Sequence, residues 1–228
     1  MIQLKVFSTN AVNAALTELI PMFERESGHK TTIDFNSTEQ ILDRVRSGET
    51  ADVVIATAPA IDELTSLDRV VAGSRADLGS TGVGVGVRAG ARKPDLGSTE
   101  AFRRALLDAD SIAYASRGVG GMLLERVIGQ LGIAAQIKPR CRTIPGGLVG
   151  ELVVRGEAEL CVQMVSEILA VEGCELAGPL PPELQQNTMF AAAVFAGTPH
   201  ADAAQALIGF LTGPVATCTM KARGLDPP

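Results

Sequence analysis

The sequence predicts an α/β protein of two lobes, each a doubly wound, mainly parallel sheet with helices on both faces. Strand-like apolar runs alternate with helical patterns along the chain. The runs are short and nearly continuous, as in Val53-Val54-Ile55-Ala56, which is typical of parallel strands covered on both faces. Three of the runs end in small hydroxyl, amide or glycine residues, and a helical pattern begins directly afterwards.

The first lobe begins with a regular alternation of strand and helix. Ala11, Ala15 and Leu19 recur at helical spacing, and Gly28 provides the stop. We expect strands at 3–7, 31–35 and 52–56, and helices at 11–26, 38–47 and 59–66.

A second α/β unit begins near residue 81. We expect strands at 82–87, 111–115, 141–144 and 159–164, helices at 98–108, 120–131 and 147–155, and, after a proline-rich loop at 179–182, a strand at 188–195 and helices at 200–212 and 214–222. Segments 81–87 and 188–195 are rich in small and β-prone residues. We interpret them as two crossings that form a hinge. This makes lobe 1 discontinuous, with residues 1–80 and 197–228, and assigns 81–196 to lobe 2.

Composition excludes several classes of protein. The chain has 228 residues, 46% of them hydrophobic, and a net charge of -6 with no basic block, so we expect no nucleic-acid partner. No apolar run approaches the ~20 residues of a membrane span, so we expect no membrane insertion. The chain as given opens in a strand pattern without a signal peptide; we expect a periplasmic location if a leader has been removed and a cytoplasmic one otherwise.

The cysteines and histidines do not form a metal-binding pattern. The four cysteines lack CxxC spacing, and there are two histidines, so we expect no metal site. Cys161 is interpreted as a small buried hydrophobe, and a bridge to Cys174 stays open as an alternative in an oxidising compartment.

Three strand-to-helix junctions are candidate anion sites. They are Ser8-Thr9-Asn10, Asn36-Ser37-Thr38, and the segment from Ser116 to Gly121. Each would place hydroxyls and backbone N–H groups at the positive end of a helix, where an anion is stabilised. Ser, Thr and Asn at such positions are more often helix caps. Convergence of several junctions would turn caps into an anion clamp.

Several segments resemble the type II solute-binding proteins, in particular the molybdate-binding family of bacterial ABC importers. The segments are 6–11 before a helix ending at 23–28, 35–38, 48–56, 155–160 and 206–214. Their order and spacing cover nearly the whole chain. The resemblance implies two lobes that close on a small anion, with an ABC transporter permease as a partner.

The ligand positions depart from the molybdate pattern. Where that family has a serine in the first motif, this chain has Ala11; Thr38 keeps the second hydroxyl, but the glycine after it is Glu39. The family's tyrosine falls at Met164. Arg117 is new to the third motif, and a guanidinium binds planar carboxylates through two parallel hydrogen bonds. These departures favour an organic carboxylate over a bare tetrahedral oxyanion.

The glycine-rich segments do not match nucleotide motifs. Neither 118–121 nor 145–148 ends in the Lys-Ser/Thr of a P-loop, and no GxGxxG follows the first strand, so we expect no cofactor. Gly146-Gly147 is equally consistent with open N–H donors and with a tight turn. Gly82, Gly84 and Gly86 are interpreted as one face of a hinge strand.

Together these arguments define a set of candidate ligand-binding residues, without a catalytic assignment. Glu39 is the one acidic residue inside a candidate motif, and a first-turn glutamate that faces solvent is the alternative interpretation. The set comprises Ser8, Thr9, Asn10, Ser37, Thr38, Thr57, Arg117, Gly118, Gly120, Gly146, Gly147 and Gln163.

The leading functional hypothesis is an ABC-transporter-type solute-binding protein that holds a di- or tricarboxylate in the cleft between its lobes. The alternative is an enzyme on the same scaffold, because aconitate isomerases resemble molybdate-binding proteins and shift a proton along an unsaturated tricarboxylate without a cofactor. Binding of molybdate or another tetrahedral oxyanion is the third hypothesis. The sequence does not decide between binding protein and enzyme.

Overall fold

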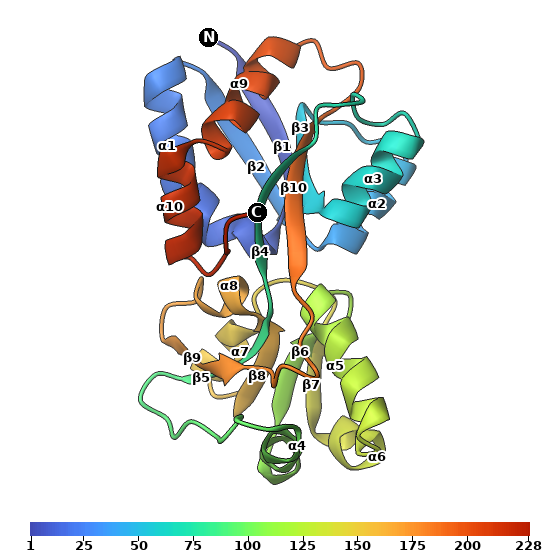
Figure 1. Cartoon of the computed structure of the whole chain (residues 1–228), viewed down its shortest axis with the longest axis vertical. Helices are drawn as coiled ribbons and strands as arrows, with labels where there is room; N and C mark the ends of the chain where they lie inside the picture. Colours follow the sequence, from blue (N-terminus) through green and yellow to red (C-terminus); the bar gives the residue numbers. More distant parts are fainter. The chain divides into compact units, whose positions relative to one another are not determined.

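The computed structural model describes residues 1–228, which divide into two compact units (Figure 1). Unit 1 comprises Met1–Ser80 with Thr188–Pro228, and unit 2 comprises Thr81–Asn187. The chain therefore passes from one unit to the other twice, at 80–81 and at 187–188. Residues 188–196, which the sequence analysis assigned to lobe 2, belong to unit 1 because the strand they contain pairs within its sheet.

Unit 1 contains a mixed sheet of five strands in the order β2-β1-β3-β10-β4. Strands β1 and β2 are parallel, β3 is parallel to β1, and β10 runs antiparallel to β3. The strands are β1 (Gln3–Thr9), β2 (Lys30–Asn36), β3 (Val53–Thr57), β4 (Ala76–Thr81) and β10 (Thr188–Val194). All five residues of β3 are buried, so its continuous apolar pattern fits a central strand with both faces covered.

Helices cover both faces of this sheet (Figure 1). Helices α1, α9 and α10 lie on one face, and α2 and α3 on the other. They are α1 (Asn13–Ser27), α2 (Thr38–Arg46), α3 (Ala58–Ser66), α9 (Ala201–Leu211) and α10 (Pro214–Ala222), with a short 3-10 turn η1 (Asn10–Val12) before α1. Helix α1 ends at Gly28, whose φ of 71° is left-handed and suits glycine.

Unit 2 contains a second mixed sheet of five strands in the order β7-β6-β8-β5-β9. Strands β7 and β8 run parallel to β6, and β5 runs antiparallel to β8 and β9. The strands are β5 (Val83–Arg88), β6 (Ile112–Ala115), β7 (Cys141–Ile144), β8 (Leu160–Met164) and β9 (Cys174–Pro179). The predicted α/β class, with two sheets covered on both faces, is confirmed.

The helices of unit 2 surround this sheet, with α4, α5 and α6 on one side and α7 and α8 on the other (Figure 1). They are α4 (Thr99–Asp108), α5 (Val119–Gln130), α6 (Ala134–Ile137), α7 (Gly150–Val154) and α8 (Val165–Ile168), with a 3-10 turn η2 (Lys138–Arg140). Strands β4 and β9 and the four-residue helices α6 and α8 were not predicted. Predicted helix 147–155 is shorter, because 145–148 remains a loop.

Glycines in β5 make room for neighbouring side chains. A Cβ atom on Gly84 would lie 2.8 Å from Leu176 Cδ1, and one on Gly86 would lie 2.6 Å from Cys161 Sγ and 3.0 Å from Cys174 Sγ. All four cysteines are free thiols. Cys161 is fully buried, as predicted, within the core of unit 2.

No single helix is long and apolar enough to cross a membrane, although α9 and α10, bent by 59°, pass a test of length and composition as a pair. Five residues of α9 and two of α10 are buried in the structure.

Candidate functional site

The carboxyl ends of three neighbouring parallel strands meet at one edge of the unit 1 sheet. Thr9 at the end of β1 pairs with Asn36 at the end of β2. Ser8 pairs with Ile55, two residues before the end of β3 at Thr57. Ligands of open α/β sheets bind beyond such ends. The register therefore brings the polar residues of 8–10, 36–38 and 57 to one edge.

Two serines of the predicted set are engaged by the protein itself. The Ser37 Oγ accepts a hydrogen bond of 3.2 Å from the Gln40 backbone N–H, and the Ser37 N–H donates to Gln40 Oε1 at 2.9 Å. This reciprocal pair is a capping box, which begins helix α2. The Ser8 hydroxyl donates to the Thr9 carbonyl at 3.2 Å. These two residues have structural roles at the strand ends.

Four other side chains at this edge are buried but make no hydrogen bond to the rest of the protein. Thr9, Asn10, Thr38 and Thr57 are 4%, 7%, 9% and 9% exposed. Neither Thr9 nor Thr57 makes a side-chain cap for the helix that follows it, and the Thr38 Oγ1 atom is buried without a partner. Buried polar atoms in proteins are normally satisfied. This row of hydroxyl and amide groups therefore fits a polar ligand at the edge of unit 1.

Unit 2 has the same kind of edge at the carboxyl ends of β6, β7 and β8. Arg117 follows β6 and is exposed. Three backbone N–H groups are already engaged there: those of Ser116, Arg117 and Gly118 donate to the carbonyls of Ile144, Pro145 and Ala115. The N–H groups of residues 119–121, in the first turn of α5, have no partner within that helix, so they and the Arg117 guanidinium are the groups here whose chemistry suits an anion.

Gly120 and Gly121 serve close packing of helix α5. A Cβ atom on Gly120 would lie 3.0 Å from the Gln163 Cα, and one on Gly121 would lie 2.0 Å from the Ala115 carbonyl oxygen. Any side chain at Gly121 would therefore push α5 away from the end of β6. These contacts explain the glycines without a ligand.

Gln163, near the end of β8, joins two segments of this edge. It is 3% exposed. Its Oε1 accepts a hydrogen bond of 3.0 Å from the Val149 N–H, and its Nε2 donates to the Gly147 carbonyl at 2.7 Å. Gly147 has a φ of 104°, a left-handed conformation that suits glycine. The Gln163 amide fixes the 145–149 loop.

Glu167 and Ser166, which follow β8 in the four-residue helix α8, were not among the predicted site residues. Glu167 is partly exposed, and burial raises its pKa to about 8, against hydrogen bonds from the Met164 backbone and the Gln163 side chain. The Ser166 hydroxyl is buried without a partner. The signal in the sequence was an acidic residue three positions after the end of a strand. The short helix α8 that contains it was not predicted.

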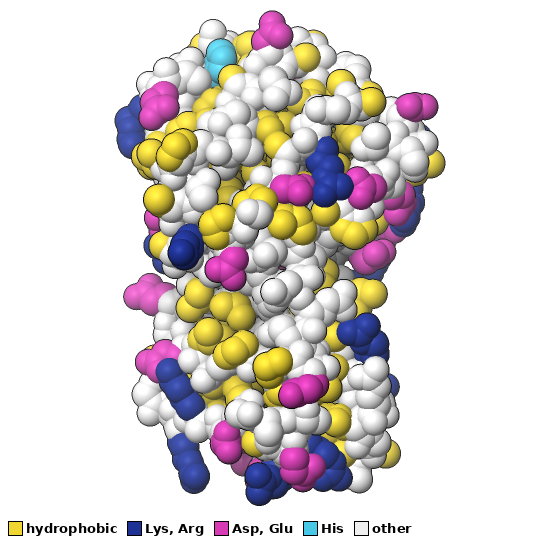
Figure 2. All heavy atoms as spheres, in the orientation of Figure 1, with side chains coloured by type: hydrophobic (Ala, Val, Ile, Leu, Met, Phe, Trp, Pro, Cys, Tyr) yellow, Lys and Arg dark blue, Asp and Glu magenta, His cyan; other side chains and the backbone are white.

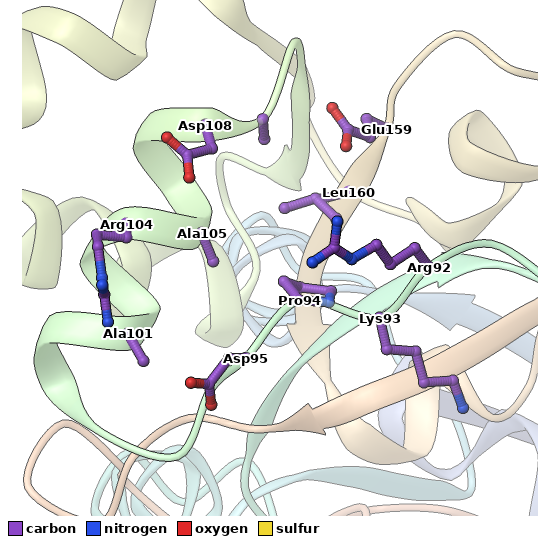
Figure 3. A pocket seen from close by; sticks show the side chains of 11 residues that line it. Arg92, Lys93, Pro94, Asp95, Ala101, Arg104, Ala105, Asp108, Glu159 and Leu160 are labelled. Atoms are coloured by element: carbon purple, nitrogen blue, oxygen red, sulfur yellow. The ribbon is translucent and has the colours of Figure 1, made fainter.

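A cavity of about 450 Å³ in unit 2 lies at the other end of the sheet. It is lined by Arg92, Arg104, Asp95, Asp108 and Glu159, beside the start of β8 (Figure 3). Both signs of charge alternate there, as they do over the face of the molecule shown in Figure 2. Its mixed charge and its place at the amino ends of the parallel strands make it a weaker anion site than the carboxyl ends.

These features define a class of protein: two α/β units, each with polar groups at the carboxyl ends of its parallel strands, suited to small anions. The chain belongs to the bacterial extracellular solute-binding protein family, whose model matches residues 4–226. The predicted superfamily is thereby confirmed.

Comparison with individual proteins gives one relative in sequence and several in fold. The chain is 32% identical over 229 residues to an aconitate isomerase from Pseudomonas sp., covering 98% of this chain and 87% of that protein. The periplasmic molybdate-binding protein of Azotobacter vinelandii matches at a TM-score of 0.83 and 20% identity, with 99% of both chains covered. The sulfate-binding protein SubI of Mycobacterium tuberculosis matches at 0.76 and 18%, over 100% of this chain and 87% of that one. The two structural matches support the fold.

Proposed function

We propose that this protein is a cofactor-independent isomerase of an unsaturated polycarboxylate, with aconitate as the first substrate to test. The observation that carries the choice of reaction is the 32% identity to aconitate isomerase over 98% of the chain. An enzyme that shifts a proton along such a substrate needs groups that hold carboxylates and a group that moves the proton. The strand ends of each unit carry polar groups suited to holding carboxylates.

The carboxylate-binding groups come from the residues described above. The row of Thr9, Asn10, Thr38 and Thr57 supplies hydroxyl and amide donors, and Arg117 supplies a cation that can bind a carboxylate with two parallel hydrogen bonds. A tricarboxylate carries up to three negative charges, so it requires several such groups.

The second candidate function is delivery of a small anion to a membrane permease. It is favoured by the match to the bacterial extracellular solute-binding protein family, which covers residues 4–226 of this chain. Such a protein needs the same donors but no group for proton transfer. The carboxylate as ligand is common to both candidates, whereas a tetrahedral oxyanion would make little use of the planar guanidinium of Arg117.

Two measurements on the purified protein separate these candidates. The first is thermal unfolding with cis-aconitate, trans-aconitate, citrate, molybdate or sulfate, because a ligand at ~100 times its dissociation constant adds ~2.7 kcal/mol to native stability. The second is proton NMR of each aconitate isomer during incubation with the protein. We expect stabilisation by aconitate and interconversion of its isomers.

Each outcome has a distinct meaning. Stabilisation by aconitate without interconversion would contradict the isomerase and support the binding protein. Stabilisation by molybdate or sulfate alone would contradict the carboxylate site. An Arg117→Ala variant with unchanged aconitate affinity and unchanged fold would remove Arg117 from the site.

A further inference from the structure

We propose that Glu167 carries the proton in this isomerisation and that Gln163 is the positioning residue that holds its carboxyl group. This inference rests on the proposed function, which by itself assigns no proton-transfer group. It comes from the placement of one carboxyl group at the strand-end edge of unit 2 and from the hydrogen bonds that surround it.

Glu167 lies where a substrate-binding edge needs a titratable group. It follows the end of β8 by three residues, next to the loop 145–149 that Gln163 fixes. The Glu167 side chain is partly exposed, so a ligand can reach it, while its neighbours Ser166 and Ile168 are 1% and 0% exposed. The Ser166 hydroxyl, buried without a partner, is a second polar group at this position.

The environment of Glu167 suits proton transfer near neutral pH. Burial raises its pKa to about 8, so both protonation states are accessible at the pH of a cell. The other acid near the candidate motifs, Glu39, lies in the first turn of α2. Glu39 is partly buried, and it interacts with Arg46 on the same helix.

A structural role for Glu167 is the competing explanation. It is the third residue of α8 after the N-cap Met164, and it accepts the Met164 backbone N–H, which is half of a capping box. A capping residue needs an acceptor but no titratable proton, so glutamine would serve equally well. Glu167→Gln therefore separates the cap from proton transfer.

The proposed reaction is a 1,3-shift within the three-carbon unit of the unsaturated acid. The Glu167 carboxylate takes a proton from the CH₂ carbon, and the electron pair of the broken C–H bond spreads over the three carbons and the attached carboxylate. The Glu167 carboxyl then returns the proton to the carbon at the other end, and the double bond moves by one position. Nothing is oxidised or reduced, and the glutamate ends in its starting state.

Gln163 orients this carboxyl group without reaching the substrate. One Nε2 hydrogen donates to the Gly147 carbonyl at 2.7 Å, Oε1 accepts from the Val149 N–H at 3.0 Å, and the side chain also donates to Glu167. The hydrogen-bonding groups of the Gln163 amide are therefore engaged by the protein itself. Its hydrogen bond to the ionised carboxyl lowers the pKa of Glu167, which keeps the base in its active form at lower pH.

The test compares Glu167→Gln with the matched control Glu172→Gln, an exposed glutamate just after α8. Isomerisation of trans-aconitate is followed by NMR, and binding by thermal shift with the same compound. We expect Glu167→Gln to lose at least ~100-fold in kcat, the scale of general acid–base catalysis, and to keep the thermal shift. Glu172→Gln should retain wild-type activity.

Gln163→Leu tests the positioning role. We expect kcat to fall while KM changes little, and the rise of kcat/KM with pH to move to higher pH, because Glu167 loses a donor that lowers its pKa. A residue that only supported the loop would leave that pH limb in place. If the rise of kcat/KM occurs at the same pH in Gln163→Leu as in wild type, the positioning role of Gln163 is contradicted.

The outcomes separate this inference from the function it rests on. Wild-type protein that converts neither isomer overturns both. An active wild type with a Glu167→Gln variant of similar kcat overturns only the assignment of Glu167. Retained binding with lost turnover in Glu167→Gln supports it, because that variant is then folded and loaded with substrate.

Discussion

Gly121 in α5 provides the sharpest test of how the site in unit 2 is positioned. A Cβ atom there would lie 2.0 Å from the Ala115 carbonyl oxygen, 2.9 Å from the Ala115 carbonyl carbon and 3.0 Å from Tyr114 Cδ2. The first two are backbone atoms that a rotamer change cannot move. Helix α5 must therefore shift by roughly 1 Å to restore an ordinary carbon–oxygen contact.

The expected cost follows from two opposing effects. Overpacking of this kind costs about 1–3 kcal/mol, and replacing a helical glycine by alanine returns up to about 1 kcal/mol. Because the clash is with backbone, we place Gly121→Ala at the severe end, about 2 kcal/mol less stable after that gain. For a chain of this size this corresponds to a loss of about 4–8 °C in Tm.

A matched control is available in the same helix. Gly129 also lies in α5, and a Cβ atom there would meet nothing within 4 Å. Gly129→Ala should therefore gain about 0.5–1 kcal/mol from helix propensity alone. Both variants are measured by urea unfolding followed by circular dichroism. A Gly121→Ala variant as stable as Gly129→Ala would refute the packing argument.

Three further predictions concern charge and backbone conformation. Arg44 bridges Asp34 at 2.6 Å and Glu49 at 2.8 Å and stacks 4.2 Å over the Phe7 ring, so Arg44→Ala should cost about 1–2 kcal/mol in urea unfolding. Arg46→Ala, whose side chain is 48% exposed, should cost less than ~0.5 kcal/mol; equal costs would contradict this ranking. Gly28→Ala should cost about 1 kcal/mol because φ is 71°, and a neutral result would show that the turn relaxes. Burial raises the pKa of Glu167 from 4.5 to about 8, so its stabilising contribution is present below pH 4.5 and is lost as pH rises toward 8, by at most ~1.4 kcal/mol per pH unit. Urea unfolding from pH 5 to 8 should show this slope in wild type and not in Glu167→Gln; parallel curves would contradict it.

The sequence predicted the alternation of strands and helices because each apolar run is long enough to identify its period. The continuous run 53–56 and the helical spacing of Ala11, Ala15 and Leu19 became β3 and α1. Strand 188–195 was found, but not its sheet. Only long-range pairing places it: β10 joins β3 through contacts more than 130 residues apart in sequence.

The candidate site was predictable in part. The strand-end position of Thr9, Thr38 and Thr57 could be inferred, since carboxyl ends of parallel strands collect polar residues. Which of the hydroxyls the protein itself uses could not, because Ser37 and Thr38 are neighbours of the same chemistry and only the capping box distinguishes them.

The glycines and Glu167 show the same limit in unit 2. Gly120 and Gly121 resembled an anion-binding loop in sequence, but a Cβ atom on either would lie 2.0–3.1 Å from backbone atoms of the neighbouring strands. Glu167 escaped notice because its raised pKa comes from burial, a property of the folded chain. The position of Glu167 after a strand end can be inferred from the sequence, but its burial and the packing around the two glycines cannot.

The most direct measurement for the central claim, a proton shift on a bound polycarboxylate, is incubation of the wild-type protein with trans-aconitate in D₂O. Proton NMR would follow both isomers and their carbon-bound hydrogens. We predict the appearance of cis-aconitate. Any deuterium should be confined to the two terminal carbons of the three-carbon unit, which lose and gain the proton. If trans-aconitate persists unchanged while the protein binds it, the proposed isomerisation is contradicted.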